Sequence, residues 1–327
     1  MSSFYDVILR CNKFNENAGG LWEFWLLDNE GPVGYMPPEL VTRIRWGGSG
    51  FQVARSERRV YLTPIVAPDD NIIDACRYHF VRLCERNVGV IEGMASWLER
   101  KVDYHPIRGL DRHLAGLAVP SPLRGVLGIV TTGVHLNVYT VKRVDGRPSM
   151  HVWVSKRSQN VTYAGKLDQI VAGAMDQTDD MDPLRTLKRE AMEEARLTVD
   201  ISSLGVSTNG VLVGVLAKGR DISFYDQKDT TAGSEEGQLE PGVRFTFDLE
   251  VDERFVPQPG EPHAIAGFFL KPVDDIKRDL KEAKWKPNCG LVMLDFLLRQ
   301  QQINPGEDEN YMLLWRGLQR RLPFRSV

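Results

Sequence analysis

The chain has 327 residues, of which 42% are hydrophobic and 26% are charged, and its formal net charge is −3. This composition allows a sizeable core in one or two domains and excludes a wholly disordered chain. Because the net charge gives no global basic field, we expect neither nucleic acid nor an anionic membrane as a partner.

Cysteine usage and the N-terminal residues predict a cytoplasmic protein. Cys11, Cys76, Cys84 and Cys289 show no CxxC spacing, which indicates reduced thiols. Asp6 interrupts the short apolar run near the N-terminus, so the pattern of a signal peptide is missing. No apolar run reaches the roughly 18 residues that a membrane span needs.

The first third of the chain predicts short strands and one amphipathic helix. Trp22–Leu27 is aromatic and aliphatic, as strands are, and a Gly/Pro-rich turn follows it. Asn71–Arg86 places its apolar residues on one side of a helix. Prolines at Val119–Pro122 interrupt regular structure because proline lacks a backbone donor. We therefore predict a domain boundary there, with an α+β accessory domain over residues 1–120.

The remainder, residues 121–327, predicts an α/β unit. Residues 126–142 and 151–157 are rich in Val, Ile, Thr and aromatics and predict strands, joined by a turn at Asp145–Pro148. A helix is predicted at 184–197. Further strands are predicted at 205–216, 243–251 and 264–271, and helices at 274–283 and 288–301. Strands around one central helix predict an α/β/α sandwich, which C-terminal helices extend.

The central helix carries the clearest chemical pattern. Its Leu and Ala residues form one stripe at ~100° per residue, whereas Glu190, Glu193 and Glu194 cluster on another face. Three close carboxylates repel one another, and a divalent cation would remove that repulsion. Oxygen ligands suit Mg²⁺ or Mn²⁺, and Arg189 can orient a carboxylate four residues on. The alternative interpretation is a solvated acidic helix face.

The run Arg189–Ala195 (REAMEEA) resembles the REUxEE centre of the Nudix box, the signature of Nudix hydrolases. Gly173 resembles the opening glycine of the box. The resemblance implies a Nudix α/β/α sandwich that cleaves a diphosphate linkage with metal ions. It implies that Glu190, Glu193 and Glu194 bind the metals, with a backbone carbonyl near Ala174, and that Glu190 is a candidate base.

The chain departs from the box pattern in the loop and after the helix. Counted back eight residues from Arg189, the loop glutamate would fall at 181, where the chain has Met181. The loop from Gly173 is then about two residues longer than the box allows, and Arg196 stands where a glycine is expected. An acidic loop residue could substitute for the glutamate, but the spacing does not identify which one. The candidates are Asp176, Asp179, Asp180 and Asp182.

A second resemblance covers most of the chain and is to the thiamine-pyrophosphokinase-related Nudix proteins. Members act on oxidised or damaged thiamine diphosphate and release the monophosphate and phosphate, so the resemblance implies metabolite repair. The N-terminal part resembles the partner domain of that family. Departures from its motifs are Lys156 for an arginine and Ala164 and Ala174 for a proline and a glycine. The matching stretches are GVHLNVY at 133–139, HVWVSKR at 151–157, GKLDQIVAG at 165–173, KPNC at 286–289 and LDFL at 294–297.

Further candidates surround the box. Glu261, in a turn, is a candidate metal ligand or base, and a purely structural turn glutamate is the alternative. Lys156 and Arg157, at a strand end, are candidates to hold the diphosphate, as are Lys286 and Asn288 of the KPNC run.

We therefore predict a Mg²⁺- or Mn²⁺-dependent Nudix hydrolase of the α+β class that acts on a small diphosphate, with a thiamine diphosphate derivative as the first candidate. Two alternatives stay open. One is hydrolysis of another nucleoside-diphosphate-type substrate, and the other is a degenerate Nudix module that binds without catalysis. The N-terminal domain either shapes the substrate pocket or forms a homodimer.

Overall fold

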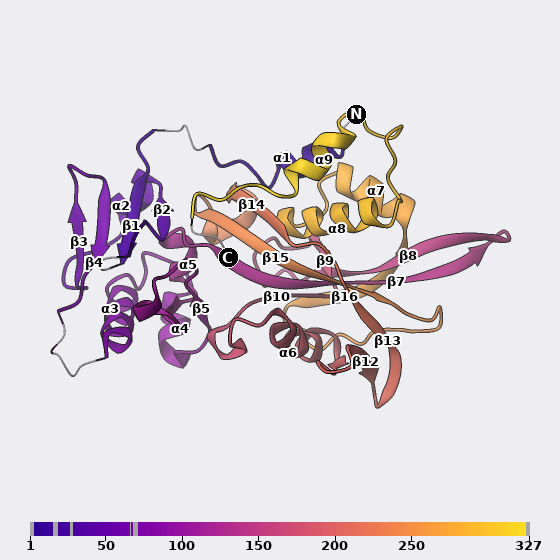
Figure 1. The fold of residues 1–327 in the computed structure, drawn as a ribbon, viewed down its shortest axis with the longest axis horizontal. Helices are drawn as coiled ribbons and strands as arrows, with labels where there is room; N and C mark the ends of the chain where they lie inside the picture. The colour runs from indigo at the N-terminus through magenta and orange to yellow at the C-terminus, as the bar shows by residue number, and fades with distance from the viewer. Residues whose placement is uncertain (1–2, 16–18, 27–28, 66, 68–70, 325–327) are drawn as a thin grey trace.

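The computed structural model describes residues 3–15, 19–26, 29–65, 67 and 71–324. A four-stranded sheet in the order β2-β1-β4-β3 forms the N-terminal part, at the left of Figure 1. Helix α3 packs against this sheet through Cys76, Phe80 and Leu83. The elements are β1 (Trp22–Leu26), β2 (Gly34–Met36), α2 (Pro38–Arg43), β3 (Phe51–Ala54), β4 (Arg59–Leu62), α3 (Ile72–Arg86), α4 (Met94–Arg100), β5 (Tyr104–Pro106), the 3-10 turn η1 (Arg112–Leu114), β6 (Ala118–Pro120) and α5 (Leu123–Val126).

The predicted strand and helix of this part are both present. The last residue of the predicted strand, Leu27, lies outside the described residues. Asn71 caps α3, because its side chain accepts a hydrogen bond of 2.8 Å from the Ile73 amide.

A ten-stranded mixed sheet forms the rest of the molecule. Its main path is β11-β12-β13-β15-β7-β8-β16, and β9, β10 and β14 pair at its sides. The elements are β7 (Thr131–Val144), β8 (Arg147–Arg157), β9 (Leu167–Gln169), β10 (Val171–Ala174), η2 (Gln177–Asp179), α6 (Pro183–Ala195), β11 (Thr198–Val199), β12 (Gly205–Thr208), β13 (Val211–Lys218), β14 (Ile222–Gln227), η3 (Thr230–Glu235), β15 (Leu239–Glu250), β16 (Ile265–Pro272), α7 (Val273–Lys281), α8 (Pro287–Arg299) and α9 (Tyr311–Gly317).

Helices cover both faces of this sheet (Figure 1). On one face, Leu187, Ala191 and Ala195 of α6 pack in the core that includes β7, so the Leu/Ala stripe is the buried side of the helix. On the other face, α7, α8 and α9 share a core with Val152 and Val154 of β8. The predicted α+β class and α/β/α sandwich are confirmed.

Two predicted strands have different bounds for identifiable reasons. The strand predicted from Val126 begins at Thr131, because α5 precedes it and Gly128 has a φ of 59°. The strand predicted over 205–216 divides into β12 and β13 at Asn209-Gly210, whose φ values of 47° and 77° are those of a tight hairpin turn. Strand β14 and helix α9 are not among the predicted elements.

The two ends of the chain pack together. Phe4, Val7 and Ile8, around helix α1 (Tyr5–Leu9), lie in the same core as α8 and α9. The core of the N-terminal part extends from Trp22 to Ile129, beyond the boundary predicted at residue 120. The division into domains 1–120 and 121–327 stays a prediction.

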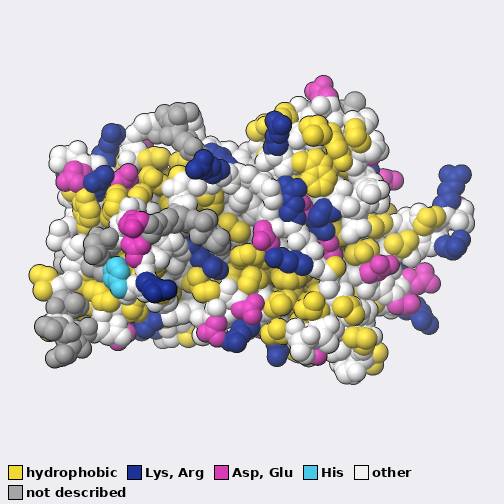
Figure 2. All heavy atoms as spheres, viewed as in Figure 1, with side chains coloured by type: hydrophobic (Ala, Val, Ile, Leu, Met, Phe, Trp, Pro, Cys, Tyr) yellow, Lys and Arg dark blue, Asp and Glu magenta, His cyan; other side chains and the backbone are white. Residues whose placement is uncertain are grey.

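The distribution of surface charge, the hydropathy of the helices and the state of the cysteines can each be compared with the sequence analysis. Acidic and basic side chains are interspersed on the face seen in Figure 2. Among the described residues, no helix is both long and apolar enough to cross a bilayer. Cys11, Cys76, Cys84 and Cys289 are all buried and unbridged, as the spacing predicted.

Candidate active site

Helix α6, which carries the box residues, is bounded by the capping residues Asp182 and Arg196. Asp182 accepts a hydrogen bond of 2.9 Å from the Leu184 amide, and Pro183 occupies the first turn. Arg196, which stands where the box expects glycine, adopts a left-handed conformation with a φ of 52°. The glycine of the pattern is therefore explained by the helix end, because glycine is the residue that enters this region most easily.

Arg189 is the centre of the site. Its Nη1 donates to Glu190 Oε1 at 2.7 Å and to Glu193 Oε2 at 3.2 Å. Its Nη2 donates to the Ala174 carbonyl at 3.1 Å. A single guanidinium thus brings together three groups that the sequence predicted as metal ligands, one from the end of β10 and two from α6.

Glu190 and Glu194 lie against β10 and stand in a strongly anionic environment. The Glu190 carboxyl group lies directly on Gly173, and Glu194 accepts a hydrogen bond of 2.6 Å from the Ala172 amide. Burial, together with the charges of Glu193 and Glu261, raises the pKa of Glu190 to about 7 against the opposing charge of Arg189. Burial and the neighbouring charge of Glu190 raise the pKa of Glu194 well above its usual range.

The three glutamates lie close together, but their carboxylates do not converge on one position where a single ion could bind all of them. Among the described residues, their carboxylates do not form a set with ligand atoms within 4.8 Å of one another. Glu193 is the most open of the three, with 47% of its side chain exposed. Binding of a divalent cation would require these side chains to turn inward from the positions that Arg189 and the Ala172 amide now hold.

Asp179 is the acidic loop residue that contacts Arg189 and is the candidate counterpart of the missing loop glutamate. Counted forward from Gly173, the Gly-x5-Glu spacing reaches Asp179 rather than Met181. The Asp179 carboxylate accepts from Arg189 Nη2 at 2.9 Å and from Thr186 Oγ1 at 2.9 Å. Burial would raise the pKa of Asp179, but these hydrogen bonds hold it below its usual value. The extra residues of the loop lie after this acid, where Asp180 and Met181 both have positive φ.

Glu261 lies in a loop that packs on the end of α6. The Gly260 amide donates to the Glu194 carbonyl at 2.7 Å, and a Cβ at Gly260 would collide with the Glu193 carbonyl. Glu261 is exposed, yet its charge contributes to the raised pKa of both Glu190 and Glu194. The loop therefore brings this carboxylate close enough to act on Glu190 and Glu194, and its role as a further ligand or base stays a prediction.

A cavity of about 110 Å³ borders β10, and its wall includes Ala172, Gly173 and Ala174 of that strand. Glu190, Glu193 and Glu194 are not among its lining residues, but the Glu190 carboxyl group packs against Gly173 of the same strand. Lys286 and Asn288 line the cavity, as expected for substrate contacts. The further polar residues of its wall are His105, Arg124, Thr131, Thr132, His135, Thr162, Tyr163, Lys228, Glu235, Glu240 and Arg244.

The other two residues predicted to hold the diphosphate lie elsewhere. Lys156 is exposed on β8 and lines a separate surface pocket with Lys271 and Lys284. Arg157 donates to Asp168 at 3.0 Å and to the Thr162 carbonyl at 2.8 Å. The structure does not bring either residue to the wall of the cavity beside the glutamates.

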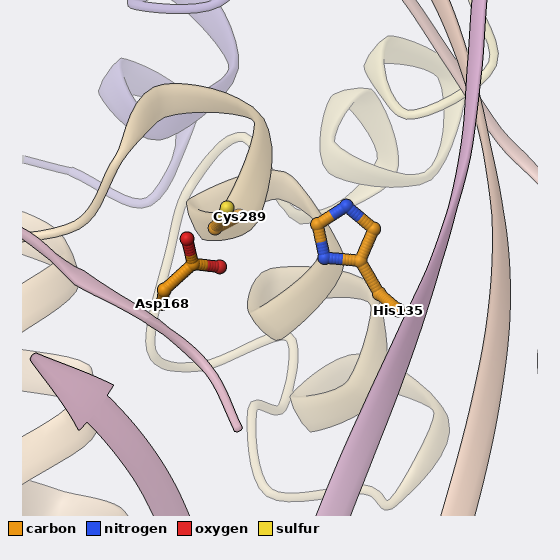
Figure 3. A group of neighbouring side chains, drawn as sticks. All are labelled: His135, Asp168 and Cys289. Carbon is orange, nitrogen blue, oxygen red and sulfur yellow. The ribbon is translucent and has the colours of Figure 1, made fainter. Parts of the chain in front are cut away.

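A buried cluster of His135, Asp168 and Cys289 lies next to this cavity, and Figure 3 shows the three side chains pointing toward one another. One candidate ligand atom of each lies within 4.8 Å of the others. Burial lowers the pKa of His135 to about 3 and raises that of the Cys289 thiol well above 9.0, so Asp168 carries the only charge. Arg157 pairs with that charge.

Several cavity residues were not predicted from the sequence. Arg244 donates to Glu240 at 2.7 Å, and Lys228 contacts Glu235 at 2.5 Å and Glu240 at 3.3 Å. These residues come from β15, from η3 and from the turn before η3, and they belong to no motif. The one sequence signal is the charge pair Glu240 and Arg244, four residues apart in a strand, which places both side chains on one face.

The chain was compared with protein-family models and with known proteins. No family model matches it. It is 31% identical over 213 residues to the uncharacterised protein YJR142W of Saccharomyces cerevisiae, across 64% of this chain and 58% of that protein. It is 27% identical over 332 residues to the chloroplastic Nudix hydrolase 20 of Arabidopsis thaliana, across 98% of this chain and 79% of that protein.

The chloroplastic Nudix hydrolase 24 of the same plant is 26% identical over 322 residues, across 97% of this chain and 78% of that protein. Similarity to both plant proteins therefore extends over nearly the whole chain, including α6 and the N-terminal part. Together with the sandwich fold and the box residues around Arg189, this similarity supports membership of the Nudix hydrolase family.

Proposed function

We propose that the chain is a metal-dependent hydrolase that cleaves a diphosphate linkage in a small molecule. The observation that carries the proposal is the convergence of Glu190, Glu193 and the Ala174 carbonyl on Arg189. Glu194 lies beside them, and a cavity lined by lysine and arginine opens next to the same strand. Carboxylates that can bind a metal cation and basic side chains that can bind a phosphate thus lie near the same strand, β10.

The donor set fits Mg²⁺ or Mn²⁺. Glu190, Glu193 and Glu194 would hold the ion with the Ala174 carbonyl, and Glu261 is a further candidate ligand. All are oxygen donors, which these ions prefer. The raised pKa of Glu190 and of Glu194 supports the fit, because mutual repulsion of the carboxylates is a cause of both shifts and a cation would relieve it. When bound, such an ion would neutralise charge on the phosphate and lower the pKa of an attacking water.

The chain itself supplies a base and phosphate contacts. Glu190 and Glu261 are the two candidate bases, and since a bound cation would lower the raised pKa of Glu190, that pKa does not select between them. Lys286 and Asn288, which line the cavity, would bind the substrate. Lys156 and Arg157 receive no such role, because they lie outside the cavity wall.

For the substrate we propose oxidised or damaged thiamine diphosphate, which would yield the monophosphate and phosphate. The support is the order of motifs along the chain and the place of their residues. His135, Asp168, Lys286, Asn288 and Cys289 all belong to those motifs and gather in or beside the cavity. The cavity is smaller than the roughly 300 Å³ at which pockets for drug-sized ligands begin. It therefore suits a phosphate group, with the rest of the ligand toward its opening.

The test is phosphate release with Mg²⁺ or Mn²⁺ across thiamine, oxidised thiamine and nucleotide diphosphates. Glu193→Gln should reduce turnover by about 10² or more, because it removes one charged ligand while leaving the shape of an exposed side chain. Glu99→Gln, the same change at an exposed site on α4, is the control and should leave turnover unchanged. Wild-type turnover in Glu193→Gln would refute the assignment.

The same panel separates the alternatives. Turnover of nucleotide diphosphates alone would select another Nudix substrate. Binding without turnover would select a degenerate module, the alternative that Met181 and the lengthened loop favour.

A further inference from the structure

Arg108 brings a guanidinium from the N-terminal part to the edge of the candidate active site. It lies between β5 and η1 and is half-buried. Its Nη2 contacts Met175 Sδ at 3.3 Å and Thr132 Oγ1 at 3.5 Å. Thr132 lines the cavity, and Met175 directly follows Ala174, whose carbonyl accepts from Arg189. Arg108 therefore stands where the cavity meets the glutamate cluster.

This guanidinium lacks the partners that buried arginines normally have. Its Nε is buried and has no hydrogen-bond partner among the described residues. Within the same set no carboxylate oxygen lies within 4.0 Å of it, whereas Arg124, Arg189 and Arg244 each have one. Burial of an uncompensated charge is unfavourable, so such a site is stabilised when an anion arrives.

The neighbouring cavity wall is already basic on balance. Arg124, Lys228 and Arg244 share two carboxylates, Glu235 and Glu240, which leaves one positive charge in excess. The wall is therefore prepared for an anionic ligand even before Arg108 is counted.

Lys286 adds to this excess. Its Nζ lies 3.9 Å from Asp168, but Arg157 binds the same carboxylate oxygen at 3.0 Å, so one negative charge serves two cations. Arg108 is not itself among the residues that line the cavity, but it contacts Thr132, which is. It therefore adds a positive charge from the N-terminal part at the edge of this basic wall.

We propose that Arg108 binds a phosphate of the diphosphate substrate, so that the N-terminal part completes the substrate site. The proposal rests on the proposed function and deepens it. Arginine suits this task because its planar fork donates two hydrogen bonds to one phosphate. The N-terminal part then acts as a wall of the substrate site, which is one of the two roles that the sequence left open.

The test compares Arg108→Gln and Arg108→Lys with Arg112→Gln, a control at an exposed arginine of η1. Pyrophosphate binding is measured by titration calorimetry without metal, and KM and kcat are measured with Mg²⁺ on the best diphosphate. Arg108→Gln should weaken pyrophosphate binding and raise KM by about tenfold to a hundredfold, as expected for a lost charge-assisted hydrogen bond. Arg108→Lys should recover part of the loss, and Arg112→Gln should match the wild type.

The outcomes also separate this proposal from the proposed function. Unchanged pyrophosphate affinity and KM in Arg108→Gln would overturn the role of Arg108, whether or not the wild type turns over. Weakened pyrophosphate binding in a chain that hydrolyses nothing would support Arg108 and overturn the hydrolase. Thermal unfolding of all variants identifies misfolding. If Arg108→Gln unfolds, Arg108→Met takes its place, because methionine keeps an unbranched side chain and removes the charge; pyrophosphate affinity equal to the wild type in that variant overturns the proposal.

Discussion

Gly173→Ala perturbs the site through a single methyl group. Gly173 lies in β10, pairs with Val134 and has no positive φ, so the backbone itself accepts alanine. The obstacle is Glu190, because the added Cβ would lie well inside 3.0 Å of its carboxyl carbon, a separation that real Cβ atoms essentially never show. Glu190 must therefore move, and its hydrogen bond to Arg189 must change with it.

The size of the effect follows from this displacement. A carboxyl group pushed back to normal contact moves by about 1 Å or more, and a misplacement of about 1 Å at a reacting centre lowers turnover by about 10². The fold should suffer less, since overpacking by one methyl costs about 1–3 kcal/mol and the displaced group is the end of a flexible side chain. We expect kcat to fall about a hundredfold while the chain stays folded.

Phosphate release measures the first effect, and thermal unfolding measures the second. Gly47→Ala is the control, because nothing lies within 4 Å of its Cβ position and its φ is not positive. That variant should match the wild type in both assays. Full turnover by Gly173→Ala would refute the role given to Glu190, since the carboxyl group could then not be needed where the structure places it.

Two further predictions concern metal and pH. Mg²⁺ at about 100 times its Kd should raise the free energy of unfolding of the wild type by about 2.7 kcal/mol, and a chelator should remove this gain. The same gain in Glu193→Gln would argue against the glutamate site. Burial and the charges of Arg124 and Arg244 lower the pKa of His105 from 6.5 to about 3. Between these two values the unfolded chain binds a proton on His105 and the folded chain does not, so the free energy of unfolding decreases as the pH is lowered below 6.5. At pH 5 this amounts to about 2 kcal/mol, and the loss between pH 7.5 and 5 should be smaller by that amount in His105→Gln; equal losses in urea unfolding would contradict it.

The sequence predicted much of the sheet and helix pattern because local signals agree with the fold. The apolar stripe of α6 and the one-sided apolar residues of α3 both mark their helices correctly. The predicted strand bounds are wrong where the end of a strand depends on a positive φ angle, as at Gly128 and Asn209-Gly210. The packing of Phe4 beneath the C-terminal helices has no local signal at all, because it depends on contacts between opposite ends of the chain.

The candidate site divides in the same way. The spacing of Glu190, Glu193 and Glu194 is a local property of a helix, so periodicity alone places them together. The convergence of His135, Asp168 and Cys289 combines β7, β9 and α8, and spacing along the chain does not show such a cluster. Residues that complete the cavity through tertiary contacts, such as Arg244, have no motif to identify them. A pattern can thus name the residues of one element, whereas the fold decides which elements meet.

Asp179 offers a direct test of how the altered box works. Its buried carboxylate binds Arg189 and Thr186, and the Asp176 amide donates to it at 3.0 Å, so it fixes the guanidinium that holds the glutamates. Asp179→Ala removes one of the three carboxylate partners of Arg189 and should destabilise the chain by about 1.5–3 kcal/mol while lowering turnover, as expected for lost hydrogen bonds to a charged group. A glutamate at 181 should not compensate, because Met181 has a φ of 61° and lies beyond the point where the loop contacts Arg189.

The decisive variant is therefore Asp179→Ala combined with Met181→Glu. If the acid at 179 is the true counterpart of the box glutamate, the double variant should remain as impaired as Asp179→Ala in thermal unfolding and in phosphate release. Asp179→Glu should retain more of both, since it keeps the charge at the same position in the loop. Recovery to wild-type values in the double variant would instead show that the spacing to Arg189 governs the site and that the loop residues can exchange roles.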